Sequence, residues 1–163
     1  GNASFAVWKS GTGKSVLLEC AFVLESLAPT RLHIDRFLPP TVIRVCVDHH
    51  GRPADPPASA VLQPGDPRRL VGQETFRRDL FPLMADAARD LSIRSSRGLI
   101  ESAGARAEEI LNRGIKRLED LAVRNPCVSP AEIHCFRRLR DETLAAIASS
   151  RVRLDALRLV WRG

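Results

Sequence analysis

One long helical segment decides the fold of this chain. Residues 82–124 read PLMADAARDLSIRSSRGLIESAGARAEEILNRGIKRLEDLAVR, with no proline after Pro82. Proline is tolerated in the first turn of a helix but not in its interior, so we expect a short helix near residues 73–80 and a long one over residues 82–124. Small and apolar residues then recur at spacings of three and four, which predicts a seam for a second helix. The seam residues are Ile100, Ala103, Ala107, Ile110, Gly114, Leu118 and Leu121.

The second helix is expected soon after the first one ends. Asn125-Pro126 stops the long helix, and Ser129-Pro130-Ala131-Glu132 has the pattern of a capping box. In this motif the serine accepts a hydrogen bond from the backbone N–H three residues later, and proline occupies the first helical position. The apolar face of this helix consists of Ile133, Phe136, Leu139, Leu144 and Ile147. Because the connection is short, we predict an antiparallel helical hairpin.

Residues 4–50, ahead of the helices, are predicted to form strands. Ser15–Ser26 is apolar on both faces, as in a central strand, and both Arg31–Phe37 and Thr41–Asp48 alternate between apolar and polar residues. The connections between these strands are too short for crossover helices, so antiparallel pairing is expected. Residues 51–67 are rich in proline and are predicted to form the loop that leads from the sheet to the helices.

The end of the chain could extend the second helix or return to the sheet as a strand. The alternation of Leu157, Leu159 and Trp161 favours a final strand over residues 153–161. The predicted fold is therefore α+β in a single domain over residues 1–163. It consists of a small antiparallel sheet, a long antiparallel helical hairpin and a last strand that returns to the sheet.

The composition indicates a basic globular protein. The chain has 163 residues, of which 44% are hydrophobic, and a net charge of +6. It is long and apolar enough for a folded core. No apolar run approaches the roughly 20 residues of a membrane span, and no secretory signal is visible, so no membrane partner is expected. The four cysteines form no Cys-x-x-Cys pair, which favours reduced thiols and a cytoplasmic protein.

The segment Trp8–Cys20 (WKSGTGKSVLLEC) contains the letters of a phosphate-binding loop. Such a loop needs the pattern Gly-x-x-x-x-Gly-Lys-Ser/Thr between a buried strand and a helix. Here Trp8 stands where the first glycine is required, and the residues after the motif favour a strand. We therefore interpret Gly11 and Gly13 as part of a hairpin turn between the first two strands. An ATP-binding enzyme is the competing hypothesis, in which Lys14 would contact phosphate.

Two groups of residues resemble metal sites but lack the required ligands. They are Asp48-His49-His50 and the group of Cys127, His134 and Cys135. Adjacent histidines on a strand point to opposite faces, and with a following glycine they are more typical of an exposed turn. The second group has no fourth ligand nearby, and adjacent residues on a helix diverge by about 100°. Since no nucleophile context is present either, we predict no catalytic, cofactor-binding or metal site.

The arginines are open to two interpretations. They could form a surface for DNA, RNA or an acidic face of a protein. They could also form a solubilising surface that is paired with nearby Asp and Glu residues. The second interpretation is favoured, because aromatic residues are not interleaved with the arginines and acids are scattered among them. The candidate interaction surface consists of Arg68, Arg69, Arg77, Arg78, Arg137 and Arg138.

Several blocks of the sequence resemble one protein family when they are taken in order. They are RFLPPT at residues 36–41, DHHG at residues 48–51, LEDL at residues 118–121 followed by Asn-Pro, and RLDALRL at residues 153–159. Their order and spacing resemble the C-terminal region of the RapA (HepA) family, which are bacterial RNA polymerase-associated ATPases of the SWI/SNF type. The resemblance covers nearly the whole chain, and its first and last blocks are the most specific.

This resemblance implies an accessory, non-catalytic domain of an ATP-dependent motor that recycles RNA polymerase during transcription. In that family the motor, with its phosphate loop and helicase motifs, lies upstream, and no Asp-Glu-x-His motif occurs in this chain. The start at Gly1, without a methionine, agrees with a piece of a longer chain. The implied partners are the rest of the parent motor and the RNA polymerase core, with DNA or RNA as a further candidate. The alternative is an independent basic module that binds nucleic acid.

Overall fold

The computed structural model describes residues 2–9, 14–125 and 127–163. Within these residues the chain forms two compact units. Unit 1 consists of Gly1–Val23, Val42–Ser95 and Val152–Gly163, and unit 2 consists of Leu24–Thr41 and Ser96–Arg151. The strand β2 (Ser15–Glu25) and the helix α2 (Phe81–Arg124) each pass from one unit into the other.

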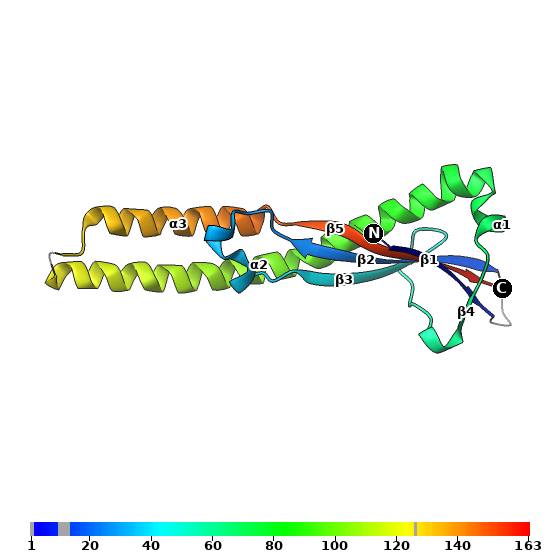
Figure 1. Cartoon of the computed structure of the whole chain (residues 1–163), viewed down its shortest axis with the longest axis horizontal. Coiled ribbons are helices and arrows are strands. Elements are labelled where there is room, and N and C mark those ends of the chain that lie inside the picture. The colour runs from blue at the N-terminus through cyan, green and yellow to red at the C-terminus, as the bar shows by residue number, and fades with distance from the viewer. Residues whose placement is uncertain (1, 10–13, 126) are drawn as a thin grey trace. The chain divides into compact units, whose positions relative to one another are not determined.

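Across the described part of the chain, a five-stranded sheet carries the core of unit 1 (Figure 1). The strands lie in the order β3-β2-β5-β1-β4. The remaining strands are β1 (Asn2–Trp8), β3 (Thr41–Asp48), β4 (Leu62–Pro64) and β5 (Arg151–Arg162). The α+β class and the return of the last strand to the sheet are thus confirmed.

The last strand lies inside the sheet, between β2 and β1. β1 pairs with β5 in parallel, with Ala3 opposite Leu157 and Phe5 opposite Leu159, whereas β1 and β4 are antiparallel. The pairing of β1 with β5 therefore differs from the expected antiparallel arrangement. Parallel strands need a long connection. The chain between β1 and β5 contains all the helices of the described residues, so it is long enough to allow parallel pairing.

The position of β5 also separates the first two strands. Because β5 lies between them, β1 and β2 are not hydrogen-bonded neighbours, and the predicted hairpin between them is wrong. That prediction assumed that consecutive strands pair, which is the commoner case. Gly11 and Gly13, to which it assigned the turn, lie outside the described residues.

The strand predicted over Arg31–Phe37 is wrong as well. This segment forms two 3₁₀ helices, Thr30–Leu32 and Ile34–Arg36, joined at His33, whose φ of 46° is left-handed. Leu32 and Ile34 are both buried, and both 3₁₀ helices pack against α3 (Pro130–Ala148). The left-handed residue between them brings alternate apolar residues to one side, so the alternation resembles that of a strand.

Both faces of the sheet in unit 1 are covered. On one face lie Leu70 from α1 (Arg68–Val71), Phe76 from the π-helical turn η4 (Phe76–Leu80) and Met84 from the start of α2, all buried. On the other face Val160 is fully buried with Leu17 and Cys46, and the proline-rich segment contributes Ala54 and Leu62. Every second residue of β2, from Val16 to Leu24, is buried, and on the opposite face Leu17 is buried and the other residues are half-buried, so β2 comes close to the central strand that its apolar sequence predicts.

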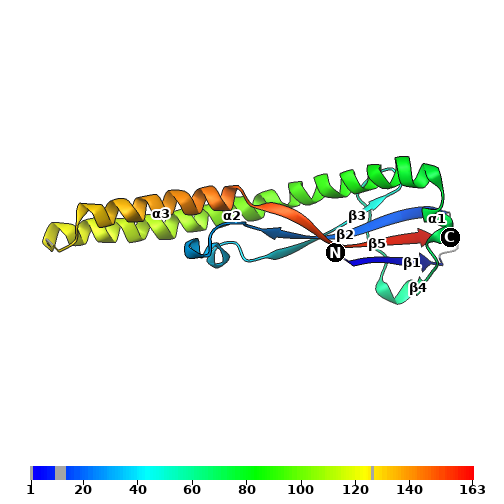
Figure 2. The same cartoon turned by 45° about the horizontal axis from the view of Figure 1, so that its top comes forward.

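The predicted helical hairpin forms in unit 2. The part of α2 that follows Ser96 lies beside α3 and antiparallel to it, as both cartoon views show (Figures 1 and 2). Arg140 Nη1 donates a hydrogen bond across the pair to Asn112 Oδ1 at 2.9 Å. The predicted cap is present: Ser129 Oγ accepts from the N–H of Glu132 at 3.2 Å, and proline follows the cap.

The seam of the hairpin follows a different stripe of α2 from the predicted one. Ala103 and Ala107 are fully buried, as expected, but Ile110 and Leu121 remain 40% and 44% exposed. Ile115, at 5% exposure, takes the inner position instead. Both stripes obey a spacing of three and four and differ only in where the three-residue steps fall, so the sequence pattern cannot separate them.

The α3 side of the seam departs from the prediction in a similar way. Ile147 is buried, as expected, and Thr143 is 2% exposed although it was not predicted to face inward. Phe136, which was assigned to the apolar face, remains 39% exposed. The hydroxyl of threonine on a helix can bond to the preceding turn, so a buried threonine is compatible with an apolar contact.

Substitutions in α2 test this revised seam. Gly114→Ala should raise the free energy of unfolding by about 0.5–1 kcal/mol, because a Cβ there would meet nothing within 4 Å and alanine is the better helix former. Ala107→Leu should lower it by about 1–3 kcal/mol, because it adds volume at a fully buried position. Urea unfolding followed by circular dichroism measures both. A clear loss of stability in Gly114→Ala would restore the predicted seam.

Candidate docking site

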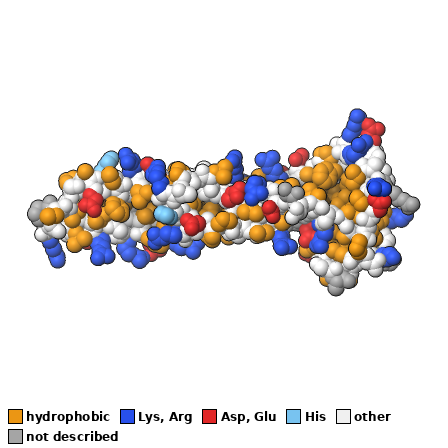
Figure 3. Space-filling model, viewed as in Figure 1, with side chains coloured by type: hydrophobic (Ala, Val, Ile, Leu, Met, Phe, Trp, Pro, Cys, Tyr) orange, Lys and Arg blue, Asp and Glu red, His pale blue; other side chains and the backbone are white. Residues whose placement is uncertain are grey.

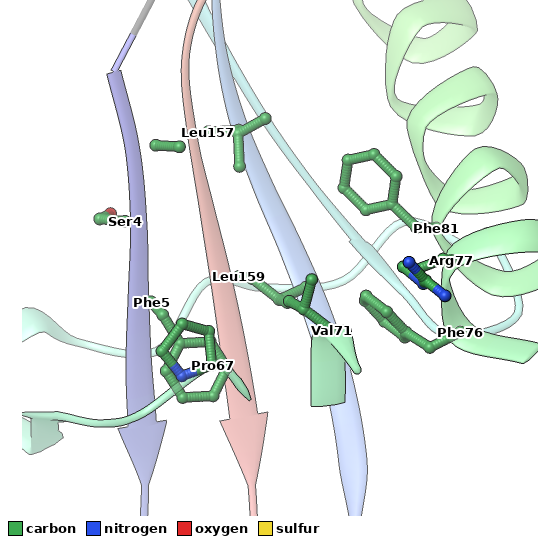
Figure 4. A pocket seen from close by; sticks show the side chains of 10 residues that line it. Ser4, Phe5, Pro67, Val71, Phe76, Arg77, Phe81, Leu157 and Leu159 are labelled. Carbon is green, nitrogen blue, oxygen red and sulfur yellow. The ribbon is translucent and has the colours of Figure 1, made fainter. Parts of the chain in front are cut away.

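An apolar pocket lies in unit 1 between the sheet and the segment that leads into α2 (Figure 4). Its volume is about 470 Å³. Small-molecule and anchor sites commonly have volumes of about 300–1,000 Å³ and mostly apolar walls. The apolar walls are formed by Phe5, Val71, Phe76, Phe81, Leu157 and Leu159. In the space-filling view, hydrophobic side chains also gather over the visible face of the strand-bearing unit (Figure 3).

The parallel pairing of β1 with β5 builds the floor of this pocket. Phe5 lies opposite Leu159 in the register of the two strands. Side chains opposite each other in a sheet point to the same face, so Phe5 and Leu159 form one apolar surface. Leu157, two residues earlier on β5, extends that surface. The floor therefore exists only because the last strand enters the sheet beside the first.

Two phenylalanines form the helical wall. The ring centroids of Phe76 and Phe81 are 6.1 Å apart and the rings are tilted by 49°, a favourable arrangement for an aromatic pair. Figure 4 shows both rings extending from the helical segment toward β5. Val71 on α1 also lines the pocket and remains 43% exposed, so the pocket opens to solvent beside it.

Arg77 gives the pocket its electrostatic character. It is the one charged side chain that lines this pocket within the described residues. It is exposed, and no salt bridge joins it to any other residue of the described part of the chain. A large apolar surface beside a free guanidinium can bind a group that has an apolar body and a negatively charged end.

Sequence reasoning selected Arg77 but missed the pocket around it. The available signals were the two phenylalanines beside Arg77 and the alternating leucines of the last strand. Neither signal shows that these segments meet, because their contact depends on the pairing of strands from opposite ends of the chain.

Two of the other predicted surface residues of unit 1 are near acids. Arg78 pairs with Glu74 at 3.2 Å, and Arg68 Nε lies 4.0 Å from Asp66. Arg69 belongs to α1, but its side chain lies outside the described residues. Exposed ion pairs of this kind contribute at most about 1 kcal/mol to stability, but they reduce the charge that is free for a partner.

The two predicted arginines of unit 2 are also paired. Arg137 on α3 bridges to Glu119 on α2, and Arg138 lies 3.7 Å from Glu142 one turn later. In Figure 3 acidic side chains are scattered among the basic ones along the helical part of the visible face. These two residues lie on a different compact unit from Arg68, Arg77 and Arg78.

The phosphate-loop letters do not have the context that phosphate binding needs. Ser15 begins the strand β2 rather than a helix, and Lys14 before it is exposed. A phosphate loop relies on the backbone N–H groups at the start of a helix. The residues directly after Lys14 form a strand and cannot supply such a helix start. Residues 10–13 lie outside the described part of the chain.

Asp48 and its two histidines form the expected turn after β3. Asp48 Oδ1 accepts hydrogen bonds from the backbone N–H groups of His50 at 2.8 Å and Arg52 at 2.9 Å, and Gly51 has a φ of +72°. Slight burial raises the pKa of Asp48, but these hydrogen bonds and the nearby histidines outweigh it and hold the pKa below its ordinary value of 3.8. The rings of His49 and His50 lie together, with centroids 4.0 Å apart, because the strand has ended.

The part of the chain that the structure describes offers no cluster of metal ligands. Among the described residues, no group of three or more His, Cys, Asp or Glu side chains could hold a metal ion. Cys127 and Cys135 are exposed and free.

The cysteines divide into buried and exposed pairs. All four thiols are free, with Cys20 and Cys46 buried and Cys127 and Cys135 exposed. Burial, and then the charge of Glu19, raises the pKa of Cys20 to about 11. Burial and the same carboxylate raise the pKa of Cys46 to about 11 as well. At neutral pH these two thiols are protonated and therefore poor nucleophiles.

A thiol-specific reagent should distinguish these pairs. At pH 8 we expect Cys127 and Cys135 to react rapidly with Ellman's reagent, because they are exposed, and Cys20 and Cys46 to react only after denaturation. Absorbance kinetics of the native and urea-unfolded chain measure this difference. Cys20→Ser should leave the rapid phase unchanged, whereas rapid reaction of all four thiols in the native state would contradict the buried placement.

Comparison with known proteins adds to this geometry. The model of the family "RNA polymerase recycling family C-terminal" matches residues 1–162. The RNA polymerase-associated protein RapA of Erwinia tasmaniensis is 31% identical over 154 residues, which cover 90% of this chain. The chain spans only 16% of that relative's length.

None of the helices in the described residues combines the length and apolar character needed to cross a membrane.

Proposed function

The chain belongs to the C-terminal domain family of the RNA polymerase recycling proteins. We therefore propose that it is an accessory, non-catalytic domain of an RNA polymerase-associated, ATP-dependent motor. The observation that carries this proposal is the family match, which extends over residues 1–162. That range includes both compact units, which supports their action as one domain. The similarity to the RNA polymerase-associated protein RapA of Erwinia tasmaniensis supports the same assignment.

The ATP-dependent step is assigned to the rest of the parent protein. The chain covers 16% of the length of its relative, so most of such a protein would lie outside it. We propose that a SWI/SNF-type, helicase-like motor, with its ATP and DNA sites, occupies that remainder. The strand that follows Lys14 supports this division, because it is unsuited to a phosphate loop.

The proposed partners follow from this division of labour. One is the rest of the parent motor, against which this domain would pack, and the other is the RNA polymerase core. The domain would help to position the motor on the polymerase. A protein with these partners would act in the cytoplasm, where bacterial transcription takes place.

Deletion and pull-down experiments test this role. We expect the chain to be retained by immobilised core RNA polymerase, and we expect the parent protein without residues 1–163 to lose both retention and recycling activity. Retention is measured by pull-down and recycling by multiple-round transcription. If the chain does not bind and its deletion changes neither retention nor recycling, the proposed role is excluded.

An independent nucleic-acid-binding module is the second candidate. The net charge of +6 favours it, but the acids beside Arg68, Arg78, Arg137 and Arg138 oppose it. Binding through phosphates would weaken steeply with salt, because each contact releases counterions.

We expect weak binding to duplex DNA or single-stranded RNA, even at low salt. Fluorescence anisotropy with labelled oligonucleotides measures it as salt is raised. Tight, salt-sensitive binding that disappears when Arg68, Arg69, Arg77 and Arg78 are all replaced by Ala would favour the second candidate. Arg94→Ala is the control, since this exposed arginine of α2 lies outside the predicted surface.

A further inference from the structure

The apolar pocket of unit 1 has the features of an anchor site for a single large side chain. Its volume of about 470 Å³ leaves room for a large aromatic or branched aliphatic side chain together with adjoining atoms, and its phenylalanine and leucine walls suit such an apolar group. Val71 is 43% exposed beside the pocket, whereas its neighbours Phe76 and Leu159 are buried and only 5% and 6% exposed. An apolar group that enters the pocket would therefore cover apolar surface that faces water in the free chain.

The charge around the pocket selects the chemistry of the rest of the ligand. Arg77 lines the pocket without an acidic partner among the described residues, whereas the adjacent Arg78 is paired with Glu74 at 3.2 Å. A carboxylate next to the anchoring side chain could accept hydrogen bonds from the Arg77 guanidinium. The net charge of +6 also favours an acidic partner through long-range attraction.

We propose that this pocket is a docking site for a short segment of RNA polymerase that presents a large apolar side chain next to a carboxylate. This inference rests on the proposed function, because it takes the polymerase as the partner. A single pocket with one cation gives a small contact, and small contacts are typical of transient complexes. A recycling factor must release its polymerase, so a small and reversible contact fits this role better than a large permanent one.

The composition of the pocket disfavours nucleic acid as the occupant. Nucleic-acid binding depends on several phosphate contacts, but the described lining of the pocket offers one cation. Recognition of a base would require donors and acceptors along its edge, and Ser4 is the one neutral polar side chain in that lining. An apolar side chain followed by a carboxylate satisfies the available groups without leaving polar edges unpaired.

Two substitutions in the full-length parent protein test the pocket. Val71→Asp places a negative charge beside it, and Arg77→Glu reverses the charge of its cation; both positions are exposed, so the fold should tolerate the changes. We expect each variant to bind core RNA polymerase at least about tenfold more weakly, because Arg77→Glu removes a charge-assisted contact and Val71→Asp puts a carboxylate beside the apolar and acidic groups of the ligand. Affinity is measured by surface plasmon resonance, and thermal unfolding verifies the fold.

Matched controls separate the pocket from general effects of charge. Val61→Asp makes the same change at an exposed valine that does not line the pocket, and Arg94→Glu does so at an exposed arginine of α2. Both controls should bind within about twofold of the wild type, since they leave the pocket intact. If they weaken binding as much as the pocket variants, the loss reflects net charge and the proposal is overturned.

Crosslinking identifies the occupant. The photoreactive residue p-benzoylphenylalanine replaces Val71 in the parent protein, which is irradiated in complex with core RNA polymerase. We expect crosslinks to a polymerase segment that has an apolar residue beside Asp or Glu. Crosslinks to the parent's own chain or to nucleic acid, or none from an intact complex, would overturn the proposal.

The two levels of the hypothesis fail in different ways. If deletion of residues 1–163 abolishes polymerase binding while Val71→Asp and Arg77→Glu bind normally, the domain still has its proposed role but the pocket does not. If the chain alone does not bind and the deletion leaves both polymerase binding and recycling intact, the proposed function fails and the docking site fails with it.

Discussion

The pairing of β5 with β1 is the interaction on which unit 1 depends. The last strand of the chain lies between β2 and β1, so it joins the β3-β2 and β1-β4 parts of one sheet. Along β5, adjacent residues serve opposite faces: Leu159 lines the apolar pocket, and Val160 is fully buried in the cluster with Leu17 and Cys46. A shift of this strand by one residue would exchange the two faces and remove both arrangements.

The same strand carries a partly buried ion pair that favours this register. Arg158 Nε donates to Glu19 Oε2 on β2 at 2.8 Å, and the two side chains are 30% and 14% exposed. A half-buried carboxylate without a cation is costly, so a register that separates Glu19 from Arg158 is penalised. On the other side of β5, the parallel register with β1 places Phe5 opposite Leu159. Polar and apolar contacts therefore favour one alignment of the strand.

The sequence predicted those parts of the fold that depend on local chemistry. Ser129 and Pro130 mark the start of α3 because a cap acts within one helical turn, and the alternation of β5 indicates a strand. It could not predict which strands pair, since the partner of β5 is β1, about 150 residues earlier in the chain. Local patterns can also mislead: the apolar residues around His33 alternate as in a strand, but the left-handed backbone of His33 joins two short 3₁₀ helices. The apolar pocket was missed for the first reason, because its floor and its helical wall come from distant segments.

The pairing of the arginines changes what their number implies. Arg78, Arg137 and Arg138 have acidic neighbours within 4.0 Å, so much of the positive charge that the sequence suggests is already balanced locally. Arg77 differs, because it lines an apolar pocket and has no acidic partner among the described residues. A polyanion gains most from many free cations, whereas one free cation beside an apolar surface favours a ligand that carries both characters. The distribution of acids around the arginines, rather than the net charge, therefore makes a protein segment the better match for this site.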